Sequence, residues 1–490
     1  MAHSTLSNHK FKKGKFITPW NEFMSEIGRE NSWYYGRLPE YLWLSLIIDY
    51  YGRENGLKKC NLIIKKLREL APEIFSPKFS RILKLDQDSQ IELYKYILNT
   101  IDVSALNPLT VIFTYSHFSN FASNFYSSQV SVEKRIDKIN AVMAEVSNHQ
   151  SHLSTDVRFI VLYFDLLSGK LHMPKETFDL ILEYPTLSHD DEKMRMIRPM
   201  IRSMELVPME IDPYDESYLN TFWEAVSRMS DCELFYINLA EEAPDTQEYM
   251  HRVKTILQYY SDLLVSARPL DNKMLVLLGI ATYSYKRLLE VVDHELYTAI
   301  AGRSVVRVLI ENYIMMKYLL KNESTHDDIW TEYQYYGIGQ YKLIVERFRE
   351  SGKDLSNSHV LYKYLDCLVS EYKNKEFIDM DTSYFDKQNV RAKANCVGEK
   401  ELFGLYYDYD SAFEHGLWGA IRESSLIKCN SPAHQYHCIP DIENNQKLKS
   451  VWDDCVEVMN KTLLILQDIY GISAHLMIGD EVNGERSSES

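Results

Sequence analysis

Residues 279–321 read GIATYSYKRLLEVVDHELYTAIAGRSVVRVLIENYIMMKYLLK. Apolar residues recur here at spacings of three and four, the period of a helix that buries one face. The same spacing appears far from this stretch, for example at Leu42 and Leu46 and at Phe159 and Leu162. The 18 glycines and 14 prolines in 490 residues leave little of the turn punctuation that an all-β fold needs. The sequence therefore predicts an all-α protein.

The clearest interruption of the helical pattern is VPMEIDPYDES at Val207–Ser217, which contains two prolines and several acidic residues. A chain of 490 residues is also too long for one ordinary core. The predicted organisation is a basic arm over residues 1–17, an N-terminal helical domain over 18–206, a linker over 207–216, a C-terminal helical domain over 217–475 and a disordered tail over 476–490.

The formal net charge of −16 argues against a surface that coats nucleic acid, because phosphate binding needs clustered Lys and Arg. The charge is uneven, since residues 1–85 hold fifteen Lys or Arg against eight Asp or Glu. The arm HKFKKGK at His9–Lys15 could meet a phosphate backbone or an acidic partner. A solvated basic surface explains the same residues, and the sequence leaves both interpretations open.

The seven cysteines are scattered and odd in number, which is typical of reduced cytosolic proteins. The N-terminus lacks the apolar stretch of a secretory signal, and the apolar run Met274–Tyr285 is too short to cross a bilayer. We therefore expect a soluble, cytoplasmic protein that does not contact a membrane. The chain contains no phosphate-binding Walker loop and no glycine-rich dinucleotide turn, so no cofactor is predicted.

Polar side chains within apolar helical patterns need a reason, because burying them unpaired costs free energy. Arg287 and His294 are seven positions apart, so on a helix they project from one face, about 10 Å apart along the axis. A guanidinium can hold a phosphodiester while a histidine transfers a proton, which suits metal-free RNA cleavage. The alternative is that Arg287 pairs with Glu290 or Asp293 and that His294 is a surface residue.

Arg303, Arg307 and Glu311 follow one another at four-residue steps beside a core-forming stripe. They form either a partly buried ion-pair ladder or the lining of a site, and the sequence leaves this choice open. A third candidate is His415, which is followed by Gly416. A small neighbour permits the close approach of another backbone or a ligand, although a histidine hydrogen-bonded within a helical core is the commoner case.

Two clusters of residues have side chains that bind metals. One offers sulfur and nitrogen ligands, at Cys429, His434, His437 and Cys438, and the other offers carboxylates, at Asp408, Asp410 and Glu414. The spacing of the first cluster matches no standard pair of zinc ligand clusters, and nothing fixes the geometry of the second. We therefore predict no metal site.

The C-terminal half, roughly Ser217–His475, resembles a bacterial domain family of unknown function related in pattern to the HEPN superfamily of helical ribonucleases. The resemblance rests on GRSVVRVLIENY at Gly302–Tyr313 and on LYYDYDSAFEHG at Leu405–Gly416. It implies a HEPN-like helical bundle and a setting in bacterial defence against phage.

HEPN ribonucleases typically carry an Arg, four to six residues and then a His, and they act as dimers. Arg287 and His294, with six residues between them, fit that pattern. His415 does not, because Asp408, Tyr409 and Asp410 occupy the positions where its arginine would stand.

With the setting in phage defence that the resemblance implies, the predicted function is an anti-phage effector that cleaves RNA without a metal. Arg287 and Arg307 would bind phosphate, His294 or His415 would transfer protons, and Glu311 would orient an arginine. The expected partners are RNA and a second copy of the chain, or a protein bound through the N-terminal domain. The alternative is a non-catalytic interaction or sensor protein of a defence system, and a receptor for a small nucleotide is a third hypothesis.

Overall fold

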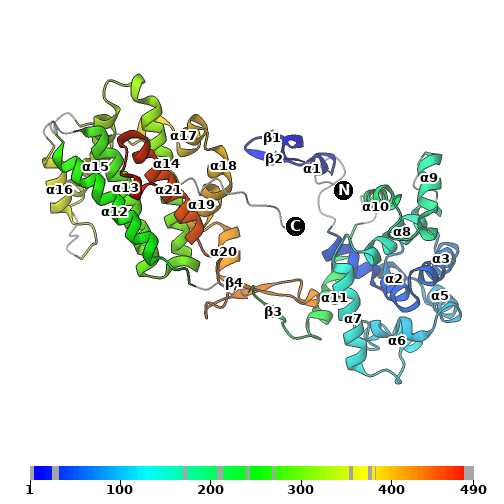
Figure 1. Cartoon of the computed structure of the whole chain (residues 1–490). Helices are drawn as coiled ribbons and strands as arrows, with labels where there is room; N and C mark the ends of the chain where they lie inside the picture. Colours follow the sequence, from blue (N-terminus) through cyan, green and yellow to red (C-terminus); the bar gives the residue numbers. More distant parts are fainter. Residues whose placement is uncertain are drawn as a thin grey trace. The chain divides into compact units, whose positions relative to one another are not determined.

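The computed structural model describes residues 5–24, 32–167, 169, 174–206, 213–237, 239, 243–267, 271–352, 357–372, 378–380 and 382–478. Helices dominate these ranges, and the strands form only a two-stranded and a three-stranded sheet (Figure 1). The predicted all-α fold class is confirmed. Most of the predicted tail, residues 479–490, lies outside the described ranges.

The chain divides into two compact units. The first unit comprises residues 1–235 and 428–439, and the second comprises residues 236–427 and 440–490. The division therefore lies after the predicted linker at 207–216, of which 207–212 fall outside the described residues.

The reason is that the helix after the linker, α11 (Glu216–Ser227), packs into the first unit. The Tyr218 hydroxyl donates to the carbonyl of Pro39 at 2.8 Å, and the Trp223 indole donates to that of Tyr35 at 3.0 Å. Prolines and acidic residues interrupt a helix, but the shared core decides which unit the next helix joins.

The helices of the first unit pack around α2, whose residues from Leu38 to Ile48 are all buried. The elements before residue 236 are β1 (Lys10–Lys12), β2 (Lys15–Ile17), α1 (Pro19–Met24), α2 (Leu38–Tyr51), α3 (Arg53–Leu70), α4 (Phe79–Ile82), α5 (Gln87–Thr100), α6 (Ser119–Phe125), α7 (Val132–Ser147), α8 (His152–Leu167), α9 (Lys175–Leu182), α10 (Met194–Met204), α11 and β3 (Leu234–Phe235).

Several charged groups buried beside α2 meet partners. The Glu40 carboxylate accepts from the backbone N–H of Ser80 at 2.9 Å and from its hydroxyl at 2.7 Å, which ties α2 to α4. The guanidinium of Arg37 bonds to Glu205, whose carboxylate also lies 3.7 Å from Nε of Arg158. Buried charges that meet opposite charges in this way fix the packing of the elements that carry them.

The basic arm forms a hairpin. β1 and β2 pair antiparallel, and Lys13 and Gly14 adopt positive φ at the turn between them. Phe11 and Phe16 face each other across the two strands with ring centroids 5.0 Å apart, and both remain exposed.

The segment 428–439 joins the first unit through the three-stranded sheet, in the order β3, β4 (Leu426–Cys429) and β5 (Cys438–Pro440). β3 pairs antiparallel with β4, with Leu234 opposite Cys429 and Phe235 opposite Lys428. Residues about 200 positions apart in sequence are therefore held side by side in this unit.

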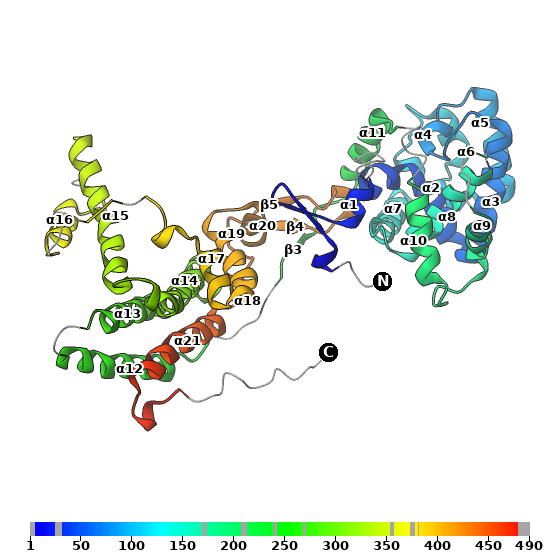
Figure 2. The same ribbon diagram turned by 90° about the horizontal axis from the view of Figure 1, so that it is seen from above.

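The second unit is a helical bundle in which α14 packs against α13, α17, α19 and α21, and α12 packs against α13 (Figure 2). Its helices are α12 (Gln247–Ser266), α13 (Asn272–Asp293), α14 (Ile300–Asn322), α15 (Ile329–Ser351), α16 (Tyr362–Ser370), α17 (Val390–Val397), α18 (Lys400–Leu402), α19 (Asp408–Glu414), α20 (Trp418–Ser424) and α21 (Trp452–Tyr470). None of the helices in the described ranges combines the length and apolarity needed to cross a lipid bilayer.

The first turn of α14 is packed closely against the preceding segment. A Cβ added at Gly302 would lie 2.3 Å from the carbonyl oxygen of Leu296, so a side chain cannot fit there without movement of the backbone. This glycine sets the start of the helix that carries Arg303, Arg307 and Glu311.

Candidate functional site

α14 and α19 lie antiparallel and share a row of polar side-chain contacts. The contacting residues run in opposite directions along the chain. Each residue about one turn further along α14 contacts a residue about one turn earlier in α19 or in the π-helical turn Phe403–Tyr407 that precedes α19. The contacts are Ser304 with Glu414 at 2.5 Å, Arg307 with Ser411 at 3.1 Å and Glu311 with Tyr407 at 3.3 Å. This row, which we call the α14–α19 face, contains two of the predicted site residues, Arg307 and Glu311.

Arg307 is held on the α14–α19 face mainly by hydroxyl groups. Its Nε donates to Oγ of Ser411 at 3.1 Å, and its Nη2 donates to the hydroxyl of Tyr407 at 2.9 Å. The guanidinium also lies 4.9 Å from the centroid of the Tyr407 ring. Its Nη1 has no hydrogen-bond partner among the described residues, and the side chain is 21% exposed. The guanidinium is thus oriented and keeps donors for another group.

Glu311 supports this arrangement from the next turn of α14. Its carboxylate lies 3.8 Å from Nη2 of Arg307 and accepts hydrogen bonds from Tyr384 at 2.7 Å and from Tyr407 at 3.3 Å. Burial, and next the charge of Glu311, raises the pKa of Tyr384 far above the ordinary value for tyrosine. Tyr384 therefore stays protonated and remains a donor to the carboxylate.

Arg303 is placed differently, although it lies only one turn before Arg307. It is 3% exposed, and its guanidinium donates to the backbone carbonyls of Tyr297 at 3.3 Å, Ala299 at 3.4 Å and Lys449. Burial lowers its pKa. Its Nη1 and Nη2 donate to backbone oxygens in a buried setting, so Arg303 is a structural residue.

Asp410 lies behind the α14–α19 face and is 4% exposed. Burial raises the pKa of its carboxyl to about 7, and the nearby charges of Arg303 and Arg307 oppose this shift. A carboxyl with such a pKa exchanges its proton near neutral pH. The sequence had suggested Asp410 as a possible metal ligand and as a residue at a position where the HEPN pattern has an arginine, and not as a buried carboxyl.

The two predicted histidines follow the ends of their helices and are exposed. His294 follows α13 and His415 follows α19, and neither ring forms a hydrogen bond or ion pair with any residue the structure describes. Among the described residues, no backbone approaches Gly416 closely, because none of their atoms lies within 4 Å of a Cβ placed there. Gly416 instead takes a φ of 56°, the left-handed conformation that ends a helix.

Arg287 bonds to Glu290, three positions further along α13, which is one of the pairings that the sequence left open. Within the described part of the chain, no hydrogen bond or ion pair connects Arg287, His294 or His415 to Arg307. The structure thus assembles Arg307 and Glu311 but does not bring the remaining predicted residues into contact with them.

The three carboxylates that the sequence offered as ligands for a divalent ion have three different environments. Asp408 pairs with Arg391 at 3.0 Å, Glu414 accepts from Ser304, and Asp410 is buried. Across the described ranges, only one group of three or more potential metal ligands comes together, and it does not include these residues.

The hydroxyl groups of the site were not predicted. Tyr407 and Ser411 lie within LYYDYDSAFEHG at a four-residue spacing, so an antiparallel partner for α14 could have suggested them. Tyr384 lies in the irregular segment that precedes α17, and no sequence pattern indicates it.

Comparison with known proteins adds one match. Residues 280–434 match the model of a family of unknown function (DUF5677). The matched range includes Arg287, His294, Arg307, Glu311 and His415, and so covers the α14–α19 face. No curated protein and no solved structure matches the chain.

Proposed function

We propose that this protein is a bacterial anti-phage defence effector that cleaves RNA without a metal ion, with the α14–α19 face as its phosphate-binding surface. The observation that carries the proposal is the state of Arg307. Its guanidinium is positioned by neutral hydroxyls, is partly exposed and keeps Nη1 without a hydrogen-bond partner among the described residues. An arginine of this kind suits a phosphodiester, which accepts two parallel hydrogen bonds.

The reaction needs no group that the chain lacks. A base removes the proton of the ribose 2′-hydroxyl, whose oxygen attacks the adjacent phosphorus while the bond to the 5′-oxygen breaks. An acid protonates the departing 5′-oxygen, which leaves a 2′,3′-cyclic phosphate and a 5′-hydroxyl. Arg307 would neutralise the charge that develops on the phosphoryl oxygens, with Glu311 and Tyr407 keeping its orientation.

His415 is the proton-transfer group that we assign to this face. It follows α19 one turn beyond Ser411, the residue that contacts Arg307, and its backbone N–H bonds to the Ser411 carbonyl at 3.1 Å. Its exposed ring is available to a polynucleotide, and an imidazole can both accept and donate a proton. Arg287 and His294 are the second pair that we propose, following the likeness to HEPN ribonucleases. Such enzymes act as dimers, and we propose a homodimer here.

Incubation of the full-length protein with total RNA in excess EDTA tests the activity, with analysis of the fragment ends. We expect cyclic or 2′/3′-phosphate ends, and loss of cleavage in Arg307→Ala and His415→Ala. Two matched controls should stay active: Arg349→Ala, which removes a half-exposed arginine of α15, and His251→Ala, which removes an exposed histidine of α12. Cleavage that survives in Arg307→Ala would overturn the assignment of the face.

The second candidate function is a non-catalytic interaction or sensor protein of a defence system. It is favoured by the use of Arg303 to bind backbone carbonyls and of Arg287 to bind Glu290, since these arginines serve the bundle itself. RNA that stays intact with EDTA, with Mg²⁺ or Mn²⁺ and with phage lysate as a trigger would contradict the nuclease and favour this second function. Light scattering of the purified protein would test the proposed dimer, and a monomeric mass would contradict it.

A further inference from the structure

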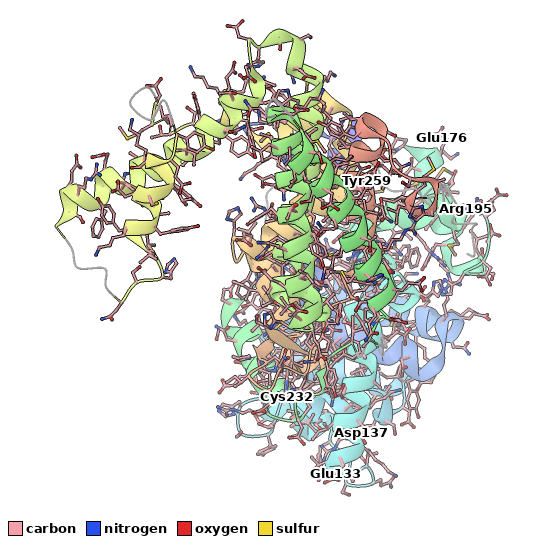
Figure 3. All side chains as sticks on the ribbon, turned by 60° about the vertical axis from the view of Figure 1, so that its left-hand side comes forward. Glu133, Asp137, Glu176, Arg195, Cys232 and Tyr259 are labelled. Carbon is pink, nitrogen blue, oxygen red and sulfur yellow. The ribbon has the colours of Figure 1, made fainter. Side chains whose placement is uncertain are left out.

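Two cysteines and two histidines of the first unit converge on one point. Sγ of Cys232 lies 3.3 Å from Nδ1 of His434 and 3.2 Å from Nε2 of His437, and Sγ of Cys429 lies 3.5 Å from Nδ1 of His434. One ligand atom from each of the four residues can be chosen so that all lie within 4.8 Å of one another. Cys232 is labelled in Figure 3.

These separations fit a tetrahedral zinc site. Zinc binds thiolate sulfur at about 2.3 Å and imidazole nitrogen at about 2.0–2.1 Å, so neighbouring ligand atoms around it lie about 3.3–3.8 Å apart. The three sulfur–nitrogen distances above fall in or just below that range. Two thiolates with two imidazoles are also a ligand set that selects zinc over magnesium or calcium.

The second nitrogen of His434 shows that the ring is oriented for metal binding. Nε2 lies 2.8 Å from the carbonyl oxygen of Ser230 and 3.0 Å from that of Ser227. A carbonyl only accepts, so Nε2 carries the hydrogen and the lone pair is on Nδ1, the atom that faces both cysteines. Metal-bound histidines are typically held by such a bond from the other ring nitrogen.

The backbone between the two histidines is shaped to present both. Gln435 and Tyr436 adopt φ angles of 54° and 51°. Residues other than glycine rarely take such angles, because they cost free energy. They reverse the chain so that the backbone N–H of Cys429 bonds to the carbonyl of His437 at 2.8 Å. Consecutive left-handed residues persist where the surroundings hold them, and a bound metal would supply that constraint.

We propose that Cys232, Cys429, His434 and His437 bind one zinc ion as a structural site. Four protein ligands complete the tetrahedron and leave no position for a reacting water, which distinguishes this site from a hydrolytic centre. The sequence had offered Cys438 as the fourth ligand, but Cys438 is not part of the group. Successive side chains of an extended segment point to opposite sides, so Cys438 cannot readily join its neighbour His437.

The zinc ion would join parts of the first unit that are distant in sequence. Cys232 and His434 are 202 residues apart, and closing so long a loop has an entropic cost that metal binding can offset. A pocket of about 600 Å³, lined by Tyr35, Trp223, Cys232, His434 and His437 among others, gives the ion a path from solvent. The site is independent of the proposed nuclease activity.

Metal analysis of the full-length protein, purified from zinc-supplied medium without chelator, tests the proposal. We expect about one zinc per chain, a loss of that zinc in Cys232→Ser and Cys429→Ser, and full retention in Cys438→Ser. Absence of metal from the wild type, a different metal in its place, or loss of zinc from Cys438→Ser with retention in Cys232→Ser would each overturn it.

A second measurement avoids variants that fail to fold. Thiol alkylation of the wild-type protein, read by mass spectrometry, should modify exposed Cys367 rapidly with or without EDTA. Cys232, which is also exposed, should be protected until EDTA removes the zinc. Replacement of zinc by Co²⁺ should give the visible absorption of a tetrahedral site and a sulfur-to-cobalt charge-transfer band. Equal labelling of Cys232 before and after EDTA would refute the zinc site.

Discussion

The buried arginine pair of the first unit and Arg307 of the second unit have different partners. In the first unit, Arg37 and Arg158 share the carboxylate of Glu205, which is fully buried, and both guanidinium groups stack on the ring of Trp33. In the second unit, Arg307 lies on the α14–α19 face between two hydroxyls, 3.8 Å from the nearest carboxylate oxygen of Glu311.

The difference separates an arginine that stabilises the fold from one that is available to a ligand. A guanidinium sealed with a carboxylate has no charge left for a partner, and removing either group leaves the other buried and unpaired. Arg307 is partly exposed, its nearest partners are hydroxyls and its ion pair with Glu311 is 3.8 Å long, so its charge remains accessible to a ligand. We expect substitutions at Glu205 and its arginines to change stability, and substitutions at Arg307 to change ligand binding.

The largest expected effect is that of Glu205→Gln. Two buried arginines would lose their anion, so the first unit should be destabilised by about 3–5 kcal/mol. Hydrogen exchange of peptides from α2 and α8, followed by mass spectrometry, measures this unit separately. The control Glu224→Gln disrupts an exposed pair with Arg228 and should cost less than about 1 kcal/mol. Equal effects of the two variants would break the comparison.

Arg303→Met should have the next largest effect, in the second unit. The variant removes a charged donor from three backbone carbonyls, and its expected cost is about 3 kcal/mol in the exchange of α14 peptides. If Arg303→Met were as stable as the wild type but lost RNA binding, Arg303 would belong to the site instead of the core.

The pH dependence of Asp410→Asn sharpens the comparison further. The folded carboxyl has a pKa raised to about 7, whereas in the unfolded chain it ionises near pH 4. The wild type therefore loses stability from this group as the pH rises from about 4 to 7, and the variant does not. Relative to the wild type, Asp410→Asn should gain about 2–3 kcal/mol between pH 5 and pH 8.

The matched control is Asp408→Asn, which changes an exposed carboxylate paired with Arg391. Its stability relative to the wild type should hardly depend on pH over the same range. Urea denaturation at several pH values measures both variants, and parallel pH profiles for the wild type and Asp410→Asn would show that Asp410 ionises normally.

The smallest expected effect on stability is that of Arg307→Met. Its partners are hydroxyls that can turn to water and a carboxylate already bonded to Tyr384, so the cost should be below about 1 kcal/mol. RNA binding, measured by fluorescence anisotropy, should nevertheless fall at least tenfold. A strongly destabilised Arg307→Met would place Arg307 with Arg303 as a structural residue.

The helices were predictable because the spacing of residues within each segment is enough to indicate a helix. The spacing of apolar residues in GIATYSYKRLLEVVDHELY and GRSVVRVLIENY indicates α13 and α14 without knowledge of their partners. The boundary between units was less predictable. Residues 213–215 of the predicted interruption are non-helical, but contacts of Tyr218 and Trp223 with distant residues place α11 in the first unit.

The candidate site was predictable in part for the same reason. Arg307 and Glu311 lie on one helix, so a four-residue spacing reveals them. The different environment of Arg303, which has the same spacing, depends on Lys449 before α21, 146 positions further along the chain. Spacing alone could not distinguish these two arginines.

The sequence by itself determined the fold class, the line of Arg303, Arg307 and Glu311 on one helical pattern, and a run of zinc-binding residue types near the C-terminus. Each of these depends on residues a few positions apart, whose geometry a helix or a turn fixes. Tertiary structure alone decided which arginine is sealed and which is open, and it replaced Cys438 with Cys232 beside His434 and His437. Those outcomes depend on contacts between residues a hundred or more positions apart, which no local spacing encodes.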